Sequence, residues 1–335
     1  MNEEAYIRES LYSTTIMKKI IPAFQQFQDH YAERFTKIDS KSVGNKGGIT
    51  ETFWVTSSML KKGNHPRIYY HGKKTKDVIV LTHGLSDSPH YMDAVARRFY
   101  KEGLNVILAL LPAHGLKDPD KAMEDRELDS KWREEIDACI SVAEQLGNRI
   151  SLGGFSAGGA LSYNAILRQP KKIKGGLFLF AAAIDVALVN NIGRISFIRT
   201  ITKITDGVIF GVGRNPYKYP CFPKYGALEL GDIIRENIKL GNTKKIKQPV
   251  FAAHSIEDKT AKLEGVLDLV KNKCVNGIAF LISANVAHGE VPLSKDITLD
   301  NKQTKGPKRI PKANPDFEAM MDSMIRFFKN RVEAG

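Results

Sequence analysis

Ser156 has the sequence context of a serine nucleophile. It is the central residue of a G-x-S-x-G motif at 154–158, which follows an apolar run at 150–155 and precedes small residues that favour a helix. A strand, a sharp turn and a helix in this order expose the hydroxyl and hold its backbone in a strained conformation. The glycines are required because a side chain two residues before or after the serine would collide with the neighbouring strand or helix. We therefore predict that Ser156 is a nucleophile.

Two later residues can activate this hydroxyl. A serine is a weak nucleophile unless a base lies within hydrogen-bond reach and a carboxylate orients that base. Asp258 follows an apolar run at 249–254, and His288 follows another at 278–283. Ligands of a parallel sheet bind outside the carboxyl ends of its strands, so residues directly after the strands gather there. We expect Ser156, Asp258 and His288 to form a catalytic triad.

Strands that alternate with helices are expected to position these residues. Buried strands are predicted at 77–84, 105–112, 150–155, 175–184, 249–254 and 278–283, and helices at 88–101, 128–146 and 315–332. Before them, 49–58 and 66–73 have the alternation of a hairpin, with 49–58 as an edge strand after a loop at 41–48. This order predicts an α/β fold, with a mostly parallel central sheet flanked by helices.

The sequence divides into three parts. Residues 1–48 are predicted to be an N-terminal helical extension, residues 49–184 and 248–335 the core, and residues 185–247 a helical lid inserted between the sixth and seventh strands. Apolar residues at helical spacing in 4–35 predict amphipathic helices. We expect these helices to pack on the core, with a membrane surface as the alternative.

Composition and charge limit the class of partner. The net charge is +13, but the lysines are scattered, so nucleic acid is not expected as a partner. Basic charge predicts weak peripheral contact with an anionic membrane, and the polar, lysine-bearing stretch at 290–314 is either a contact of this kind or a solvated linker. No apolar run has the length of a membrane span and the N-terminus does not resemble a signal peptide, which predicts a cytoplasmic protein.

Cysteine and metal-ligand patterns exclude two further classes. Cys139, Cys221 and Cys274 are widely spaced and odd in number, which favours buried thiols in a reducing compartment over a disulfide framework. Clusters with metal-ligand spacing are missing from the sequence, so we expect neither a metal nor a cofactor. The oligomeric state does not follow from these patterns.

The order of the three candidate residues along the chain is typical of one superfamily. Ser156, Asp258 and His288 follow one another as they do in the α/β-hydrolases. Over about residues 50–332 the chain resembles that superfamily, in particular its esterase, monoacylglycerol lipase and serine-aminopeptidase-like branch. The resemblance implies a serine carboxylic-ester hydrolase that cleaves a small-molecule acyl ester, such as a monoacylglycerol, through an acyl-enzyme intermediate.

Two further motifs carry the resemblance. The H-G-L segment at 83–85 is similar to the oxyanion segment of the family, which implies that the backbone N–H groups of Leu85 and Ala157 form the oxyanion hole. The P-A-H-G segment at 112–115 is similar to the P-G-H-G turn of the family, with an alanine in place of the first glycine. We interpret His114, within this turn, as structural.

Other residues compete for the roles of base and acid. His83 precedes the serine motif, and it is better explained as bracing its own loop than as the base. Glu257 and Asp185 are alternatives for the acid. We favour Asp258 because it has the usual offset after its strand in this chain order.

The lid is expected to decide which substrate binds. Its apolar residues recur at helical spacing, with Ile192, Ile195 and Phe197 as candidates for the lining of an acyl pocket, and a further helix is predicted at 228–240. The alternative is a lid that only packs on the core. An apolar lid favours esters over peptides, whose free amine would require carboxylates. A lysophospholipase, an acyl thioesterase and a non-catalytic ligand-binding protein remain alternatives, and the acyl length and leaving group stay open.

Overall fold

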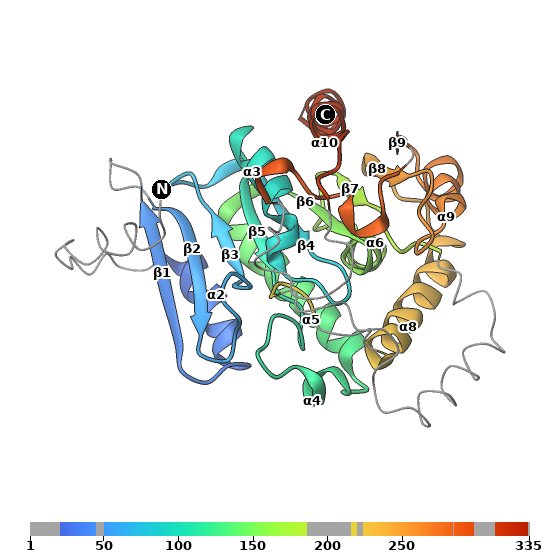
Figure 1. Ribbon diagram of the computed structural model, residues 1–335. Helices are drawn as coiled ribbons and strands as arrows, with labels where there is room; N and C mark the ends of the chain where they lie inside the picture. The colour runs from blue at the N-terminus through green and yellow to red at the C-terminus, as the bar shows by residue number, and fades with distance from the viewer. Residues whose placement is uncertain are drawn as a thin grey trace.

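The computed structural model describes residues 21–44, 50–185, 216–219, 224–283, 285–297 and 312–333. The described strands form one nine-stranded sheet in the order β1-β2-β3-β5-β4-β6-β7-β8-β9 (Figure 1). They are β1 (Ile38–Gly44), β2 (Thr50–Ser57), β3 (Arg67–Tyr69), β4 (Thr75–Thr82), β5 (Asn105–Ala109), β6 (Gly147–Phe155), β7 (Leu177–Phe180), β8 (Val250–Ser255) and β9 (Gly277–Ile282). All pairs from β5 through β9 are parallel, and β1, β2, β3 and β5 join by antiparallel pairs. The predicted α/β fold is confirmed.

Helices cover both faces of this sheet. They are α2 (Pro22–Ala32), α3 (Asp93–Lys101), α4 (Asp120–Met123), α5 (Leu128–Leu146), α6 (Ala157–Arg168), α8 (Lys224–Gly241), α9 (Leu263–Asp268) and α10 (Phe317–Phe327). One apolar core joins α2, α5, α6 and α8 to the sheet, and a second joins α3 and α10 to the other face. Among the described helices, none is both long and apolar enough to cross a membrane.

β4 lies at the centre of the sheet and shows why the run at 77–84 is apolar. Val80 pairs with Ile107 of β5 on one side and with Leu152 of β6 on the other. Residues 78–81 are fully buried, because helices cover both faces of the strand. A central parallel strand therefore needs a continuous apolar run instead of an alternating one.

The sheet begins earlier than the sequence pattern indicates. β1 pairs antiparallel with β2, from Ile38 opposite Ser57 to Val43 opposite Thr52. The predicted loop at 41–48 is therefore wrong for residues 41–44, and β2 is not an edge strand. β1 is mostly exposed and polar, which an antiparallel edge strand tolerates because water solvates its outer side. Such a strand lacks the apolar pattern that reveals the others.

The N-terminal helix α2 packs on the core, as the first of the two alternatives predicts. The ring of Phe24 stacks on that of Phe53 in β2, with 4.4 Å between centroids. Glu135 of α5 is fully buried; it accepts hydrogen bonds from the Tyr31 hydroxyl at 2.5 Å and from His30 at 2.8 Å, and forms an ion pair with Arg34. Residues 1–20 lie outside the described residues, and the three-part division of the chain stays a prediction.

Helix α8 lies within the predicted lid and packs on the helices of the core. It lies between β7 and β8, where the insertion was expected, but its buried residues Ile233 and Ile234 belong to the same core as α5 and α6. The side-chain amide of Asn237 donates to the Ala160 carbonyl at 2.8 Å. Residues 224–241 thus pack on the core, and a Cβ added to Gly226 near the start of α8 would lie 3.1 Å from the side chain of Leu85, so the lid stays a prediction. The candidates Ile192, Ile195 and Phe197 lie outside the described residues, so their role in a pocket stays a prediction.

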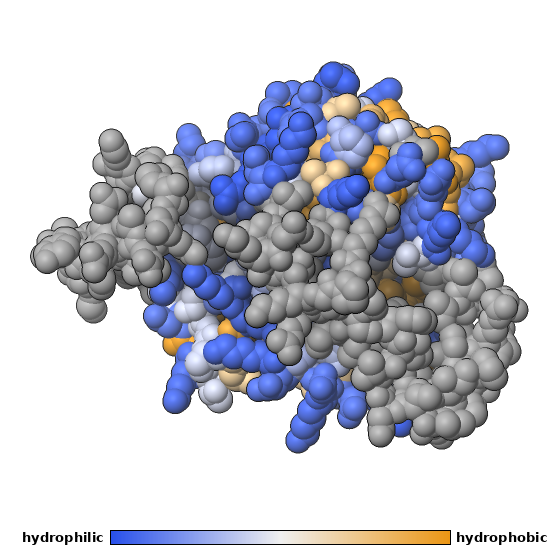
Figure 2. All heavy atoms as spheres, in the orientation of Figure 1, coloured by the Kyte–Doolittle hydropathy of each residue, from blue (hydrophilic) through white to orange (hydrophobic). Residues whose placement is uncertain are grey.

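The far edge of the sheet is partly apolar. β9 pairs with β8 on one side only, and Val275, Ile278 and Leu281 at this edge are exposed. Figure 2 shows apolar surface on the side of the molecule where β8 and β9 lie in Figure 1. The apolar run at 278–283 therefore forms an edge strand whose side chains are partly exposed.

The described cysteines are buried thiols, as the sequence predicts for them. Cys139 and Cys274 are free and buried. Burial raises the pKa of both thiols above the usual value, which keeps them protonated and poorly nucleophilic. Cys221 lies outside the described residues.

Candidate active site

Ser156 occupies a strained turn between β6 and α6. Its φ is 52° and its ψ is −114°, a conformation that residues other than glycine rarely adopt. A Cβ on Gly154 would lie 2.3 Å from the carbonyl carbon of Gly158, and a Cβ on Gly158 would lie 2.2 Å from the Thr82 carbonyl oxygen of β4. The predicted need for glycine at both positions is confirmed, because only glycine allows β4, β6 and α6 to approach this closely.

The structure brings together the three residues predicted as a triad. The Ser156 hydroxyl lies 2.8 Å from Nε2 of His288, and Nδ1 of the same ring lies 2.6 Å from Oδ2 of Asp258. The serine follows β6, the carboxylate follows β8 and the imidazole follows β9. Because these strands are parallel, their carboxyl ends meet at one edge. The arrangement allows the imidazole to accept the serine proton while the carboxylate holds the opposite ring nitrogen.

Asp258 is held in its ionised form. Its side chain is fully buried, and the N–H groups of Thr260 and Ala261 donate to Oδ1 at 2.8 and 3.0 Å. Burial alone would raise the pKa of this carboxyl, but the hydrogen bond and charge of His288 and the two N–H groups outweigh it and lower the pKa below the usual value. An ionised carboxylate stabilises the imidazolium that forms when serine loses its proton.

The two competing acids lie elsewhere. The side chain of Asp185 is 3.9 Å from the ammonium of Lys262, and Glu257 is exposed. Asp258 is the carboxylate that contacts His288, in agreement with its favoured position after β8. His254, at the end of β8, is buried, its Nε2–H donates to the Ala261 carbonyl at 3.1 Å, and burial lowers its pKa.

A buried glutamate that the sequence interpretation missed fixes the turn of His288. Glu290 accepts the Ala287 N–H at 2.9 Å through Oε2 and the Lys312 N–H at 3.0 Å through Oε1. The stretch at 290–314, interpreted as a solvated linker or a membrane contact, is thus anchored at both of its described ends, and 298–311 lies outside the described residues. In the sequence, the position of Glu290 two residues after His288 is the feature that could have indicated this role.

His83 braces the loop that follows β4, as predicted. Its Nδ1–H donates to the Gly84 carbonyl at 2.9 Å, and its Nε2 accepts the Leu111 N–H at 3.2 Å. Burial lowers the pKa of this ring well below the usual value, so it stays neutral and keeps one donor and one acceptor. This neutral ring ties the loop after β4 to the segment after β5.

His114 braces the same loop from the other side. Its Nδ1–H donates to the Pro112 carbonyl at 2.9 Å, and its Nε2 accepts the Ser86 N–H at 3.2 Å. Burial lowers its pKa to about 4. The structural interpretation of His114 is therefore confirmed. We call residues 84–88, which these two histidines hold, the oxyanion loop.

The two expected oxyanion donors border the serine from neighbouring strands. Leu85 follows β4, and Ala157 is the first residue of α6, where backbone N–H groups have no partner within the helix. Thr82 of β4 pairs with Gly154 of β6, so the two segments leave the sheet side by side. Their role in binding an oxyanion stays a prediction.

Comparison with known families agrees with this geometry. The model of a family described as serine aminopeptidase, S33, matches residues 73–209, which include both Leu85 and Ser156. The chain has the fold of the α/β-hydrolases. A comparison of the sequence with curated proteins finds no match.

Solved structures with the same fold include several lipolytic enzymes. The metagenome-derived lipolytic enzymes LipS and LipT give 19% identity, a TM-score of 0.61 and coverage of 81% of this chain and 100% of theirs. The monoacylglycerol lipase of Paleococcus ferrophilus gives 18% identity and a TM-score of 0.55, with coverage of 79% of this chain and 98% of the lipase. A soluble variant of the monoglyceride lipase of Saccharomyces cerevisiae, bound to a substrate analogue, gives 11% identity and a TM-score of 0.58. The match covers 89% of this chain and 96% of the lipase. These likenesses show that this chain shares their fold.

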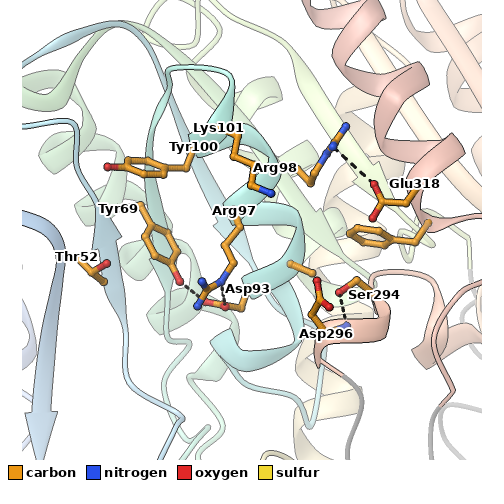
Figure 3. Close-up of a pocket in the computed structure, with 12 residues that line it drawn as sticks. Thr52, Tyr69, Asp93, Arg97, Arg98, Tyr100, Lys101, Ser294, Asp296 and Glu318 are labelled. Atoms are coloured by element: carbon orange, nitrogen blue, oxygen red, sulfur yellow. Dashed lines mark hydrogen bonds and ion pairs between the residues drawn. The ribbon is translucent and has the colours of Figure 1, made fainter. Parts of the chain in front are cut away.

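A cavity of about 710 Å³ lies beside α3, β3 and the start of α10. Figure 3 shows Arg97 directed at Asp93 and Arg98 directed at Glu318. Asp93 also accepts the Tyr69 hydroxyl at 2.5 Å and binds Arg67 at 3.0 Å. These ion pairs join α3 to β3 and to α10.

Proposed function

We propose that this chain is a serine hydrolase that cleaves acyl esters of the monoacylglycerol type through an acyl-enzyme on Ser156. The observation that carries the proposal is the continuous hydrogen-bonded path from the hydroxyl through His288 to Asp258, at 2.8 and 2.6 Å. The fold and the family match support hydrolysis in general. A ligand-binding protein that had lost turnover would be expected to have a broken path.

The proposed reaction follows from the positions of these groups. His288 takes the hydroxyl proton of Ser156 at Nε2 as the oxygen attacks the ester carbonyl. The N–H groups of Leu85 and Ala157 bind the oxyanion, and removing one donor of this kind typically costs about 3 to 4 kcal/mol of transition-state stabilisation. The imidazolium then protonates the leaving alcohol. In the second half, the imidazole takes a proton from water, which attacks the acyl-enzyme and frees the acid.

The charges near the site favour esters over peptides. An aminopeptidase requires a carboxylate to bind the free amine of its substrate. Asp87, the carboxylate of the oxyanion loop, is buried and lies 2.6 Å from the ammonium of Lys218, which neutralises it. Several neighbours in fold are described as lipases or esterases. These observations support an acyl ester as the substrate class.

Replacement of Ser156 tests the proposal. We expect Ser156→Ala to lower turnover of short-chain nitrophenyl esters by a factor on the order of 10⁴ to 10⁶, with an unchanged circular dichroism spectrum. Ser130→Ala, which alters an exposed serine of α5 that bonds to the Glu127 carbonyl, is the control and should keep full activity. Labelling of Ser156 by a fluorophosphonate should be lost in the first variant only. Turnover that survives in Ser156→Ala refutes the proposal.

A panel of substrates separates the proposed ester from its alternatives. Monoacylglycerols, thioesters and lysophospholipids share the acyl carbonyl and differ in the leaving group. We expect kcat/KM to be highest for the monoacylglycerol. A higher kcat/KM for a thioester or a lysophospholipid moves the assignment to an acyl thioesterase or a lysophospholipase with the same triad.

A further inference from the structure

A short segment from the chain between β7 and β8 lies across the oxyanion loop. We call residues 216–219 the strap. The N–H of Tyr219 donates to the Ser86 carbonyl at 2.7 Å, and the side-chain amide of Asn64 donates to the Pro216 carbonyl at 3.0 Å. The ring of Tyr217 stacks on His90 with 3.6 Å between centroids. One end of the strap is therefore attached to the oxyanion loop, and the other to Asn64, which accepts the Ser88 hydroxyl of that loop at 2.8 Å.

Lys218, the positively charged residue of the strap, forms an ion pair with the oxyanion loop. Its side chain is 16% exposed, and its ammonium lies 2.6 Å from Oδ1 of Asp87, which is 2% exposed. The same ammonium lies 4.6 Å from the centre of the Tyr91 ring. Burial disfavours the ammonium, but the charge of Asp87 outweighs this and raises the pKa of the lysine. The ammonium of Lys218 thus keeps its charge in a place shielded from water, where each partner depends on the other.

Asp87 connects this pair to the expected oxyanion donor. The Asp87 N–H donates to the Gly84 carbonyl at 3.1 Å, which closes the turn that contains Leu85. A Cβ added to Gly84 would lie 2.5 Å from Oδ2 of Asp87, so the carboxylate folds back over the turn. The carboxylate therefore lies against the turn that contains Leu85.

Lys218 also reaches the turn of the general base. A Cβ added to Gly289 would lie 3.7 Å from its ammonium nitrogen, and Gly289 directly follows His288. One side chain therefore binds the loop with an oxyanion donor and lies close to the turn with the base.

We propose that Lys218 is a positioning residue: its ammonium, paired with Asp87, holds the oxyanion loop against the His288 turn so that the Leu85 N–H faces the developing oxyanion. The inference rests on the proposed function and adds to it, since the oxyanion hole is complete only when the strap is seated. Misplacement of a reacting group by about 1 Å can cost about 10²-fold in rate. A lysine that merely fastened the strap would affect stability and not the chemical step.

Steady-state kinetics on nitrophenyl butyrate separate the two roles. We expect Lys218→Met to lower kcat by about 10- to 100-fold, with KM within threefold of the wild type, and Lys218→Arg to keep more of kcat because it retains the charge. The control is Lys131→Met, which breaks an ion pair of similar length, 2.5 Å to Asp125, on the surface of α5. A Lys218→Met variant with the kcat of Lys131→Met overturns the proposal.

A double variant covers the case in which an unpaired Asp87 prevents folding. Lys218→Met with Asp87→Asn removes both charges, which is far less costly to the fold than removing one. We expect it to fold and to recover part of the lost kcat, though not all. Full recovery of kcat in this uncharged pair overturns the claim that the ammonium positions the loop.

Hydrogen exchange tests the proposal without any substrate. We expect the backbone amides of residues 84–91 to exchange at least tenfold faster in Lys218→Met than in the wild type, and at the wild-type rate in Lys131→Met. Unchanged exchange overturns the positioning role even if esters are hydrolysed. Faster exchange in a protein that neither hydrolyses esters nor labels with a fluorophosphonate would leave the positioning role standing and refute the proposed function instead.

Discussion

The histidines around Ser156 serve different purposes. His83 and His114 each keep one ring nitrogen as a donor and one as an acceptor for backbone groups, and burial holds both rings neutral. His288 instead bonds to a hydroxyl and a carboxylate. The partners, and not the residue type, decide which imidazole can move a proton.

Ala113 tests the strain in the turn that holds His114. Its φ is 69°, a left-handed conformation that costs a non-glycine residue about 1 to 2 kcal/mol. Glycine avoids this cost but loses about 0.5 to 1 kcal/mol through chain entropy. We expect Ala113→Gly to raise the free energy of unfolding by about 0.5 to 1 kcal/mol, measured by urea denaturation. A lower urea midpoint would show that the methyl group contributes more through packing than the strain costs.

At the scale of elements, a buried charge network joins α2 to α5 and to the end of β5. Tyr31 donates to Glu135 and accepts the Leu110 N–H at 3.1 Å, and Arg34 donates to the Leu110 carbonyl at 3.0 Å. Leu111, the next residue, donates to His83. The N-terminal helix is therefore connected, through one strand end, to the loop beside the serine.

Glu135→Gln should weaken this junction. Loss of the charge leaves Arg34 and His30 without their anion, and we expect the free energy of unfolding at pH 7 to fall by about 3 kcal/mol, at the lower end of the cost of breaking a buried pair. Urea denaturation measures this difference. A change below 0.5 kcal/mol would mean that the network contributes little.

We also expect the stability of the wild type and of Glu135→Gln to depend differently on pH. Burial raises the pKa of Glu135, but Arg34 and the hydrogen bonds outweigh it, so the folded pKa lies below the usual value. A depressed pKa stabilises the fold above the unfolded pKa, about 4.3, and this contribution is lost as pH falls through the folded pKa. We expect the wild type to lose stability more steeply than Glu135→Gln below pH 5. Parallel pH profiles of the two proteins contradict this.

At the scale of the whole molecule, α2 and β1 extend one continuous sheet and core. Phe27 is 1% exposed, and its ring lies 5.0 Å from that of Tyr31 and 6.5 Å from that of Phe53. The residues at the start of the described chain thus share their core with α5 and α6. We infer that they unfold together with the sheet that carries Ser156.

Phe27→Ala tests this unity. Truncation of a fully buried phenylalanine costs about 3 to 5 kcal/mol, and we expect this loss in the unfolding of the entire protein. Esterase activity and tryptophan fluorescence, to which the buried Trp132 of α5 contributes, should be lost at one shared and lowered urea concentration. If activity survives to the wild-type midpoint, α2 is a separable extension.

The sequence by itself determined where the central strands lie along the chain and which residues follow them. Ser156, Asp258 and His288 each follow a buried apolar run, and parallel strands bring their carboxyl ends to one edge, so local pattern and general topology suffice to place them together. The helix at 128–146 has the predicted bounds, because a long amphipathic run ends at a glycine. Such features depend on residues that are neighbours in the chain.

The tertiary structure alone decided what depends on distant segments. β1 is polar and pairs only with β2, so no apolar pattern reveals it. The pair of Lys218 and Asp87, and the contact of Glu290 with the backbone of residue 312, join positions far apart in the chain. Periodicity indicates which face of an element is buried but not what lies against it. The partner of a buried charge is therefore identified only by the tertiary structure.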